Sequence, residues 1–277
     1  MSGEARVTLV ATSLTIHQRA LRSTVARKAL MAVTGLILIM FLLVHMYGNL
    51  KMFVGYEAFD HYAEWLKGKS SDGGILYPVM PAGQFIWVFR AALLLAIVLH
   101  IWSAATLSVK TMKNRGSKYQ VDKRQVQTYS SRTMRWGGVI LLLFVVWHIL
   151  QFTTLTLTPG GHYEHGRAYM NMWYGFQLWW VWLIYAVALA ALCLHVWHGV
   201  WSALQTLGAV RGNTIPFIRL IAFVLAFALF AAFMAVPTAI LFGYVDAPMA
   251  TGDYYPQFCD AIGSSAEHFA ECAAATH

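Results

Sequence analysis

The sequence predicts an all-α membrane protein with five transmembrane helices. The chain has 277 residues, of which 58% are hydrophobic and only 12% are charged, and this composition is too apolar for an ordinary soluble domain. It contains five apolar segments, each long enough to supply the roughly 20 residues that cross a bilayer. Because lipid offers the backbone no hydrogen-bond partner, we expect these segments to be helices.

The five spans are predicted at residues 28–50, 84–109, 136–158, 173–206 and 217–244. They form one membrane domain, residues 28–244, between an N-terminal segment, 1–27, and a C-terminal tail, 245–277. The 27 residues before the first span include four arginines, and no small-residue cleavage site follows the span. We therefore expect an uncleaved span and not a signal peptide.

The connections between spans carry their own signals. Residues 55–66 have apolar and aromatic side chains at helical spacing, which predicts a short amphipathic helix on the outer surface. Glycines and prolines then break the chain before the second span. Between the third and fourth spans, Pro159-Gly160-Gly161 predicts a turn that leads into an outer loop. The tryptophans within 171–182 are expected at the outer interface, where aromatic side chains concentrate.

The distribution of charge predicts the orientation of the chain. Counted together with Lys28 and Arg219 at the ends of spans 1 and 5, the segments before span 1, between spans 2 and 3, and between spans 4 and 5 hold five, eight and two of the 20 Lys and Arg residues. They hold only Glu4 and Asp122 of the 12 acidic residues. The positive-inside rule makes this side cytoplasmic, so the N-terminus is inside and the C-terminus outside.

The formal charge of +8 does not indicate nucleic-acid binding, because this asymmetry accounts for it. The basic run 110–135 is explained as a topology signal facing lipid headgroups. The alternative is a docking surface for a cytoplasmic partner.

Five histidines lie within the predicted spans, where ionisable side chains are rare unless they have a partner: His45, His100, His148, His195 and His198. A helix rises about 1.5 Å per residue, which places His45 roughly 25 Å and His148 roughly 20 Å from the inner boundary. By the same count His100 and His195 each lie roughly 15 Å from that boundary. The spans therefore carry two pairs at matched depth, one in each half of the membrane.

Two histidines at matched depth on different helices can hold a haem iron from both sides, and cofactor sites in bundles are built from facing helices. The first four spans are thus predicted to form a cofactor-binding bundle with His45, His100, His148 and His195 as metal ligands. A single histidine in a span is more often an interhelical hydrogen-bonding group. Four at paired depths favour the ligand interpretation.

Two further residues are candidates for contact with such a cofactor. His198 is turned about 60° from His195 on the helix and lies nearer the inner surface, where it could hydrogen-bond a haem propionate, a lipid headgroup or water. Arg90 lies near the outer end of span 2. Its guanidinium either extends to the interface or pairs with a propionate of the outer haem.

The cysteines permit two further hypotheses. Cys259 and Cys272 lie in the outer tail, where an oxidising compartment permits a disulfide. Cys193 lies in span 4, and a lone buried cysteine usually acts as a small hydrophobic residue. Because it stands close to His195, an iron–sulfur centre involving His195 and Cys193 is the alternative to a haem. A Rieske-type centre needs two thiolates, however, and Cys193 is the only cysteine within the spans.

Four histidine motifs resemble those of a known family. FLLVHMYGNL, LHIWSA, VVWHILQF and LHVWHGVWSALQTLG in spans 1 to 4 are similar to the motifs of the single-chain, five-helix, di-haem cytochrome b anchor of succinate:quinone oxidoreductase and fumarate reductase, respiratory complex II. The outer GYEAFDHYAEWL segment is also similar. The resemblance covers roughly residues 25–245. It implies that His45 and His148 ligate a distal haem b, and that His100 and His195 ligate a proximal one.

The resemblance implies a function for the whole chain. It would be the membrane anchor of succinate dehydrogenase in the cytoplasmic membrane of a bacterium, carrying electrons through two haem b groups to a quinone, with menaquinone expected. Its partners would be a flavoprotein and an iron–sulfur subunit on the cytoplasmic side, and higher oligomers are compatible with this role. The anchor itself would contribute the quinone-reduction site and no succinate chemistry.

Other functions stay open. The chain could be the cytochrome b subunit of another quinone-linked dehydrogenase, or a haem-free histidine proton relay or transporter. Some fumarate-reducing members of the family carry a glutamate where this chain has Cys193, and this difference favours succinate oxidation. The quinone site is predicted either at the outer acidic segment, with Glu57, Asp60, His61 and Glu64, or near Trp197 and His198.

Overall fold

The computed structural model describes residues 23–113, 129–161 and 163–245, and for residues 129–133 it describes the backbone alone. Three predictions concern residues outside these ranges: the segment 1–22, the Cys259–Cys272 disulfide and most of the tail 245–277. The central part of the basic run 110–135 also lies outside them.

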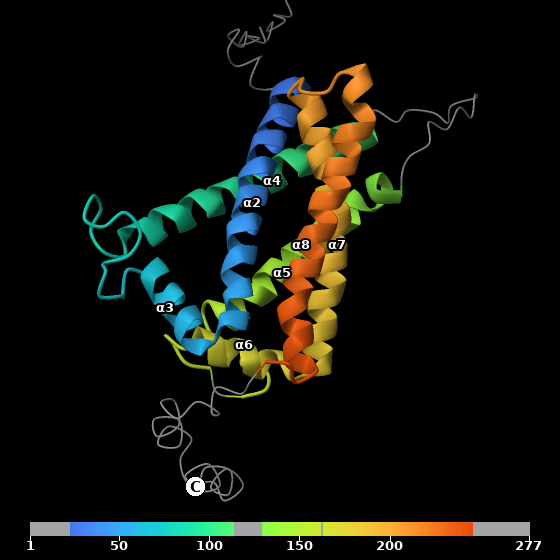
Figure 1. Ribbon diagram of the computed structural model, residues 1–277. Coiled ribbons are helices and arrows are strands. Elements are labelled where there is room, and N and C mark those ends of the chain that lie inside the picture. The colour runs from blue at the N-terminus through green and yellow to red at the C-terminus, as the bar shows by residue number, and fades with distance from the viewer. Residues whose placement is uncertain (1–22, 114–128, 162, 246–277) are drawn as a thin grey trace, which may run out of the picture.

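The described residues form seven α-helices and two short 3₁₀ turns, as Figure 1 shows. The helices are α2 (Thr24–Leu50), α3 (Tyr56–Leu66), α4 (Gln84–Lys113), α5 (Tyr129–Phe152), α6 (Ala168–Phe176), α7 (Trp179–Thr206) and α8 (Ile215–Leu241), with η1 at Lys51–Val54 and η2 at Gly212–Thr214. The helices α2, α4, α5, α7 and α8 are long and apolar enough to cross a membrane. The chain is an all-helical integral membrane protein with five candidate spans, as predicted.

The bundle is built around α2, α7 and α8. These three helices run alongside one another, while α4 packs on α2 and α5 packs on α7, both crossing obliquely (Figure 1). The predicted bundle of the first four spans therefore includes the fifth span as well. In α8, Ala222 and Ala226 are fully buried, and such small side chains let helix backbones approach closely in a membrane.

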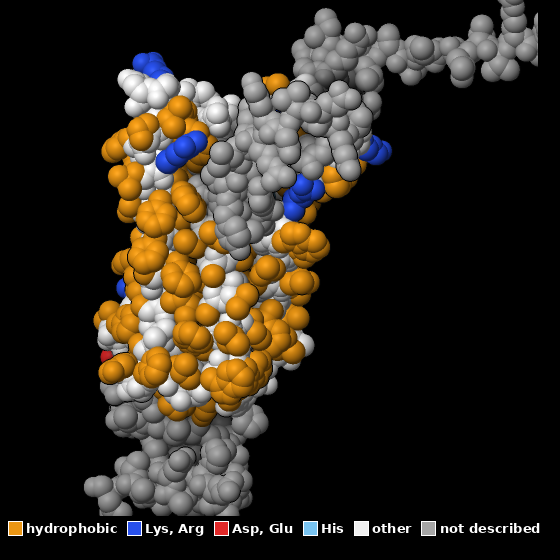
Figure 2. Space-filling model, turned by 90° about the vertical axis from the view of Figure 1, so that its right-hand side faces the viewer, with side chains coloured by type: hydrophobic (Ala, Val, Ile, Leu, Met, Phe, Trp, Pro, Cys, Tyr) orange, Lys and Arg blue, Asp and Glu red, His pale blue; other side chains and the backbone are white. Residues whose placement is uncertain are grey.

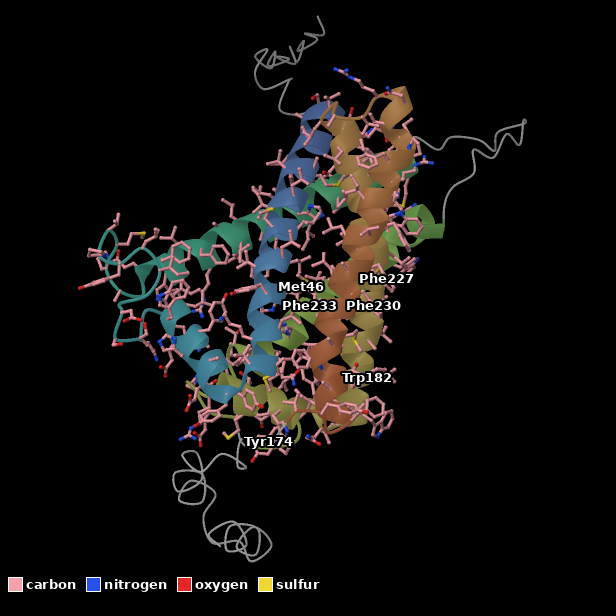
Figure 3. The ribbon with its side chains drawn as sticks, in the orientation of Figure 1. Met46, Tyr174, Trp182, Phe227, Phe230 and Phe233 are labelled. Carbon is pink, nitrogen blue, oxygen red and sulfur yellow. The ribbon has the colours of Figure 1, made fainter. Side chains whose placement is uncertain are left out.

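Aromatic side chains of α8 complete the contact with α2 and α7. Phe230 and Phe233 lie toward α2, near Met46, and they belong to the same apolar cluster (Figure 3). At the end of the bundle where α2 ends and α7 begins, which the charge distribution predicts to face outward and which we call the outer end, the Trp182 indole of α7 donates to Thr238 Oγ1 of α8 at 3.1 Å. These contacts tie the last span to the helices that carry the histidines.

The largest differences from the predicted span boundaries are in α5 and α7. The third span was predicted to reach residue 158, but α5 ends at Phe152, because the amides of Thr153 and Thr154 both bond to the Ile149 carbonyl and the chain turns there. The fourth span was predicted to start at residue 173, but α7 starts at Trp179 after an extended Leu178. The residues before that break form the separate helix α6.

An outer layer of two short helices covers one end of the bundle. The predicted helix at 55–66 is present as α3, and α6 replaces what we predicted as an outer loop (Figure 1). α6 is a buried element, with Tyr169, Met170, Met172 and Phe176 all less than a tenth exposed. It packs with η1, α3, α7 and α8 in one apolar cluster, so the outer end of the bundle is closed by protein.

Asp60 joins these two outer helices. Its Oδ1 accepts a hydrogen bond of 2.8 Å from the backbone N–H of Tyr169, in the first turn of α6. The first amides of a helix have no partner within the helix, and a carboxylate at that end both accepts from them and complements the helix dipole. Asp60 therefore holds α3 on α6 across more than 100 residues of sequence.

Asp60→Ala is expected to destabilise the protein by about 1–2 kcal/mol, the usual loss when a helix cap is removed. Asp60→Asn keeps an oxygen acceptor and should recover most of that stability. Thermal unfolding in detergent would measure both variants. Equal stability of wild type and Asp60→Ala would contradict the capping role.

The surface of the bundle is apolar where a membrane would meet it. Figure 2 shows hydrophobic side chains over most of one face, with the visible Lys and Arg side chains gathered mainly toward the end where α2 begins. Large apolar side chains such as Trp87, Leu94, Leu143 and Phe217 are mostly exposed. Soluble proteins rarely expose so much contiguous apolar surface, whereas helices facing lipid do.

Candidate functional site

The structure brings four span histidines together in two pairs. The rings of His45 (α2) and His148 (α5) have centroids 5.7 Å apart and planes at 88°. The rings of His100 (α4) and His195 (α7) have centroids 6.2 Å apart and planes at 61°. These are the pairs that the depth count predicts. A metal bonds an imidazole nitrogen at about 2 Å, so two imidazoles on opposite sides of one metal have centroids about 6 Å apart.

In the inner pair, α2 orients His100. Its Nδ1 lies 3.1 Å from the Met31 carbonyl and 3.3 Å from Thr34 Oγ1. A carbonyl can only accept, so Nδ1 carries the ring hydrogen and Nε2 keeps its lone pair. The Thr34 hydroxyl donates back to the Leu30 carbonyl at 2.7 Å, as threonines within helices commonly do. The Nε2 of His100 is thus in the form that binds a metal.

Gly35 makes room for this ring. A Cβ added at Gly35 would lie 3.2 Å from His100 Cε1, which is tighter than nearly all real contacts of this kind. The hydrogen bond to Met31 prevents the ring from moving away freely. Gly35 is therefore part of the inner site.

Polar atoms around the inner pair lack partners. Among the described residues, His195 Nδ1, Ser103 Oγ and Arg27 Nε are buried without a hydrogen bond. Ser103 lies one helical turn beyond His100, and Arg27 lies one turn before Met31. Unpaired buried polar atoms are rare in folded proteins, and where several gather a ligand or water is one explanation. This donor set fits a cofactor that carries carboxylates.

A pocket of about 210 Å³ opens beside His195, between α5 and α7. Small side chains leave this space: Gly137 on one helix, and Ala190 and Ala191 on the other. The rest of the lining is apolar. Such a pocket suits part of a flat, apolar group.

In the outer pair, a buried polar chain orients His148. Its Nδ1 lies 3.0 Å from the Tyr185 hydroxyl of α7, and that hydroxyl lies 3.0 Å from Gln151 Oε1 of α5. Gln151 is completely buried. Polar groups at such a position are expensive unless every atom has a partner.

Aromatic rings surround the outer pair. Phe41 stacks on His45 with centroids 5.2 Å apart, and Phe233 of α8 lies 5.8 Å from the same ring. Phe144 and Phe152 flank His148 at 5.8 and 5.6 Å. The outer site is therefore apolar apart from the chain that holds His148.

The remaining predicted site residues lie apart from the two pairs. Arg90 is exposed, with its guanidinium 5.1 Å from the Trp87 ring, which is a cation–π contact. His198 is half-buried on α7, one turn inward from His195. Cofactor contact by these two residues stays a prediction.

Cys193 packs against the apolar cluster of α7 and α8, whereas the His195 ring meets His100 of α4. In the part of the chain that the structure describes, no three His, Cys, Asp or Glu side chains gather as the ligands of an iron–sulfur centre would. The arrangement thus gives no support to an iron–sulfur centre at His195 and Cys193.

Sequence reasoning missed the residues that orient the ligands. Thr34, Gln151 and Tyr185 were not recognised, although a polar side chain inside an apolar span is a usable signal. Gln151 gives the clearest one, because an amide in a span must find partners. Arg27 was counted only as a topology signal.

Comparisons with known proteins do not extend this description. No protein family model, curated protein or solved structure matches the chain. The functional argument therefore rests on the residues described above and on the four histidine motifs.

Proposed function

We propose that this protein is the membrane-anchor subunit of a succinate dehydrogenase, which passes electrons from an iron–sulfur subunit to a membrane quinone through two haem b groups. The observation that carries the proposal is the pair of imidazoles in each half of the bundle, at a spacing that would let both rings of a pair hold one metal. A single pair would suit an interhelical hydrogen bond. Two stacked pairs on four spans suit an electron path across the membrane.

His45 and His148 would hold the outer haem, and His100 and His195 the inner one. When bound, haem supplies reversible one-electron transfer at its iron. The protein supplies the rest: Met31 and Tyr185 orient the ligands, and the surrounding apolar and aromatic side chains keep water away. Arg27 Nε and Ser103 Oγ, which have no hydrogen-bond partner, are suited to the propionates of the inner haem.

The direction of the chain in the membrane follows from charge. The end where α2 begins and where α7 joins α8 would face the cytoplasm of a bacterium, and Lys and Arg side chains gather toward it (Figure 2). The flavoprotein and iron–sulfur subunits would dock at that end, next to the inner pair. The C-terminus would then lie outside.

We place the quinone site, with menaquinone as the expected substrate, near the outer pair. Among the acidic candidates there, Asp60 is already engaged with the first turn of α6. Glu57 accepts a hydrogen bond of 3.3 Å from its neighbour Tyr56, and it stays available together with His61 and Glu64. These three residues, on the outer helix α3, are the proton donors to test first.

A dithionite-reduced-minus-oxidised spectrum of the detergent-purified complex, with a pyridine haemochrome count, tests the proposal. The expected result is two low-spin b haems per chain. A preparation without haem would contradict the proposal and favour the proton relay. Two haems without a co-purifying flavoprotein and iron–sulfur protein would point instead to a cytochrome b subunit of another system.

A further inference from the structure

The polar chain behind His148 runs from the outer pair to the outer surface. After Tyr185 and Gln151 it continues from Gln151 Nε2 to the Tyr163 hydroxyl at 3.2 Å, and from there to the Pro159 carbonyl at 3.0 Å. A second donor, Trp147 Nε1, reaches Gln151 Oε1 at 2.9 Å. Each amide and hydroxyl in the chain thus has a partner.

The indole of Trp147 determines which atom is the donor in each hydrogen bond between Gln151 and His148. An indole N–H can only donate, so the Gln151 atom facing it is the oxygen. The Tyr185 hydroxyl meets the same oxygen and must donate its hydrogen there. At His148 it can then only accept, so Nδ1 of His148 carries the hydrogen and Nε2 carries the lone pair.

We infer that Tyr185, held by Gln151 and Trp147, is a positioning residue that keeps the hydrogen of His148 on Nδ1 and so presents Nε2 to the iron of the outer haem. This inference rests on the proposed function. A histidine ligand that donates its other N–H to an acceptor is fixed in orientation and becomes a stronger base toward the metal. A more basic ligand stabilises the oxidised iron, which lowers its reduction potential.

The hydrogen-bonded chain of side chains from His148 to Tyr163 is unsuited to conducting protons. A relay needs groups that accept a hydrogen on one side and release one on the other, as a hydroxyl or an imidazole does. The amide of Gln151 stands in the middle with its oxygen toward Trp147 and Tyr185 and its nitrogen toward Tyr163. Passing a proton through it would require the amide to change its bonding. The hydrogen-bonded side chains therefore orient His148 and do not supply protons.

Helix α6 holds the outer end of the chain in place. A Cβ added at Gly175 of α6 would lie 2.7 Å from Gln151 Nε2, so the helix backbone packs directly on the amide. Burial raises the pKa of Tyr163 to about 12, which keeps its hydroxyl protonated as the donor to Pro159. The outer layer thus closes the network over the outer pair.

Tyr185→Phe is the direct test, because it removes only the hydroxyl. The variant is expected to bind two haems, with the reduction potential of the outer haem raised and that of the inner haem unchanged. A redox titration followed in the haem absorption bands measures both potentials. The outer component is identified as the one missing from a His148→Ala variant. Electron paramagnetic resonance of the oxidised protein should show a changed signal for that component alone.

Tyr163→Phe is the matched control. It removes a hydroxyl from the same network, but Trp147 still fixes the Gln151 oxygen toward Tyr185, so the outer potential should stay at its wild-type value. Trp147→Phe is a second test of the same inference if the Tyr185→Phe protein does not accumulate. Without the indole N–H the amide can turn round, and an intermediate rise in the outer potential is expected.

The outcomes separate the inference about Tyr185 from the proposed function. Two haems whose potentials and resonance signals are unchanged in Tyr185→Phe would overturn this inference and leave the proposed function standing. Equal shifts of both haems, or a shift of the same size in Tyr163→Phe, would also overturn it. A wild-type preparation without haem would overturn both.

Discussion

Replacing His148 by alanine is expected to remove the outer haem and leave the inner haem in place. The loss follows because the His45 and His148 rings face each other at 5.7 Å, and one imidazole alone leaves an axial position of the iron without its ligand. His45→Ala should have the same effect. In His100→Ala and His195→Ala the inner haem should be lost and the outer one retained. The pyridine haemochrome count should fall from two haems per chain to one in each variant.

Double variants test the pairing of the histidines. Each double variant within a pair, such as His45→Ala with His148→Ala, should lose no more haem than the single variants. A double variant across the pairs should lose both haems. His198→Ala separates the two imidazoles of α7, because a variant that keeps both haems assigns the ligand role to His195. Four single variants that all keep two haems would refute the pairing.

Gly35→Leu is expected to abolish the inner haem although it removes no ligand. A single Cβ at this position would already lie 3.2 Å from His100 Cε1, and a leucine side chain needs the space that the ring occupies. Overpacking of this kind forces a neighbour out of its position. His100 would lose its bond to the Met31 carbonyl and turn away from His195. The haem count should fall from two to one, with the outer component retained.

Gly138→Leu on α5 is the control for this substitution. It makes the same change within a span, but a Cβ there meets no atom within 4 Å. This variant should keep both haems. If Gly35→Leu also keeps both, with unchanged absorption spectra, then Gly35 has no part in the inner site.

Much of the fold could be predicted from local features. The five spans were found because each is a long apolar run, and the helix at 55–66 was found because its apolar side chains recur at helical spacing. The bounds of α5 and the start of α7 were predicted less well. The break at Leu178 and the turn after Phe152 depend on α6 packing beneath the bundle, and hydropathy cannot reveal such packing.

The histidine pairs could be anticipated and their supporting residues could not. Helix rise alone places His45 beside His148 in depth, and His100 beside His195, because spans of one bundle cross the same slab. Tyr185 and Met31 are different. Each acts through a contact with another helix, and nothing near either residue in the sequence identifies its partner.

By itself the sequence determined the membrane class, the number of candidate spans and which span histidines share a level in the bundle, since these depend on the length and polarity of single segments. Only the tertiary structure decided that α8 packs within the bundle, that α6 closes its outer end and that Gln151 and Tyr185 hold His148. These features join residues far apart in the chain. Their contacts form only when several helices pack together, because the free energy of each contact depends on what surrounds it.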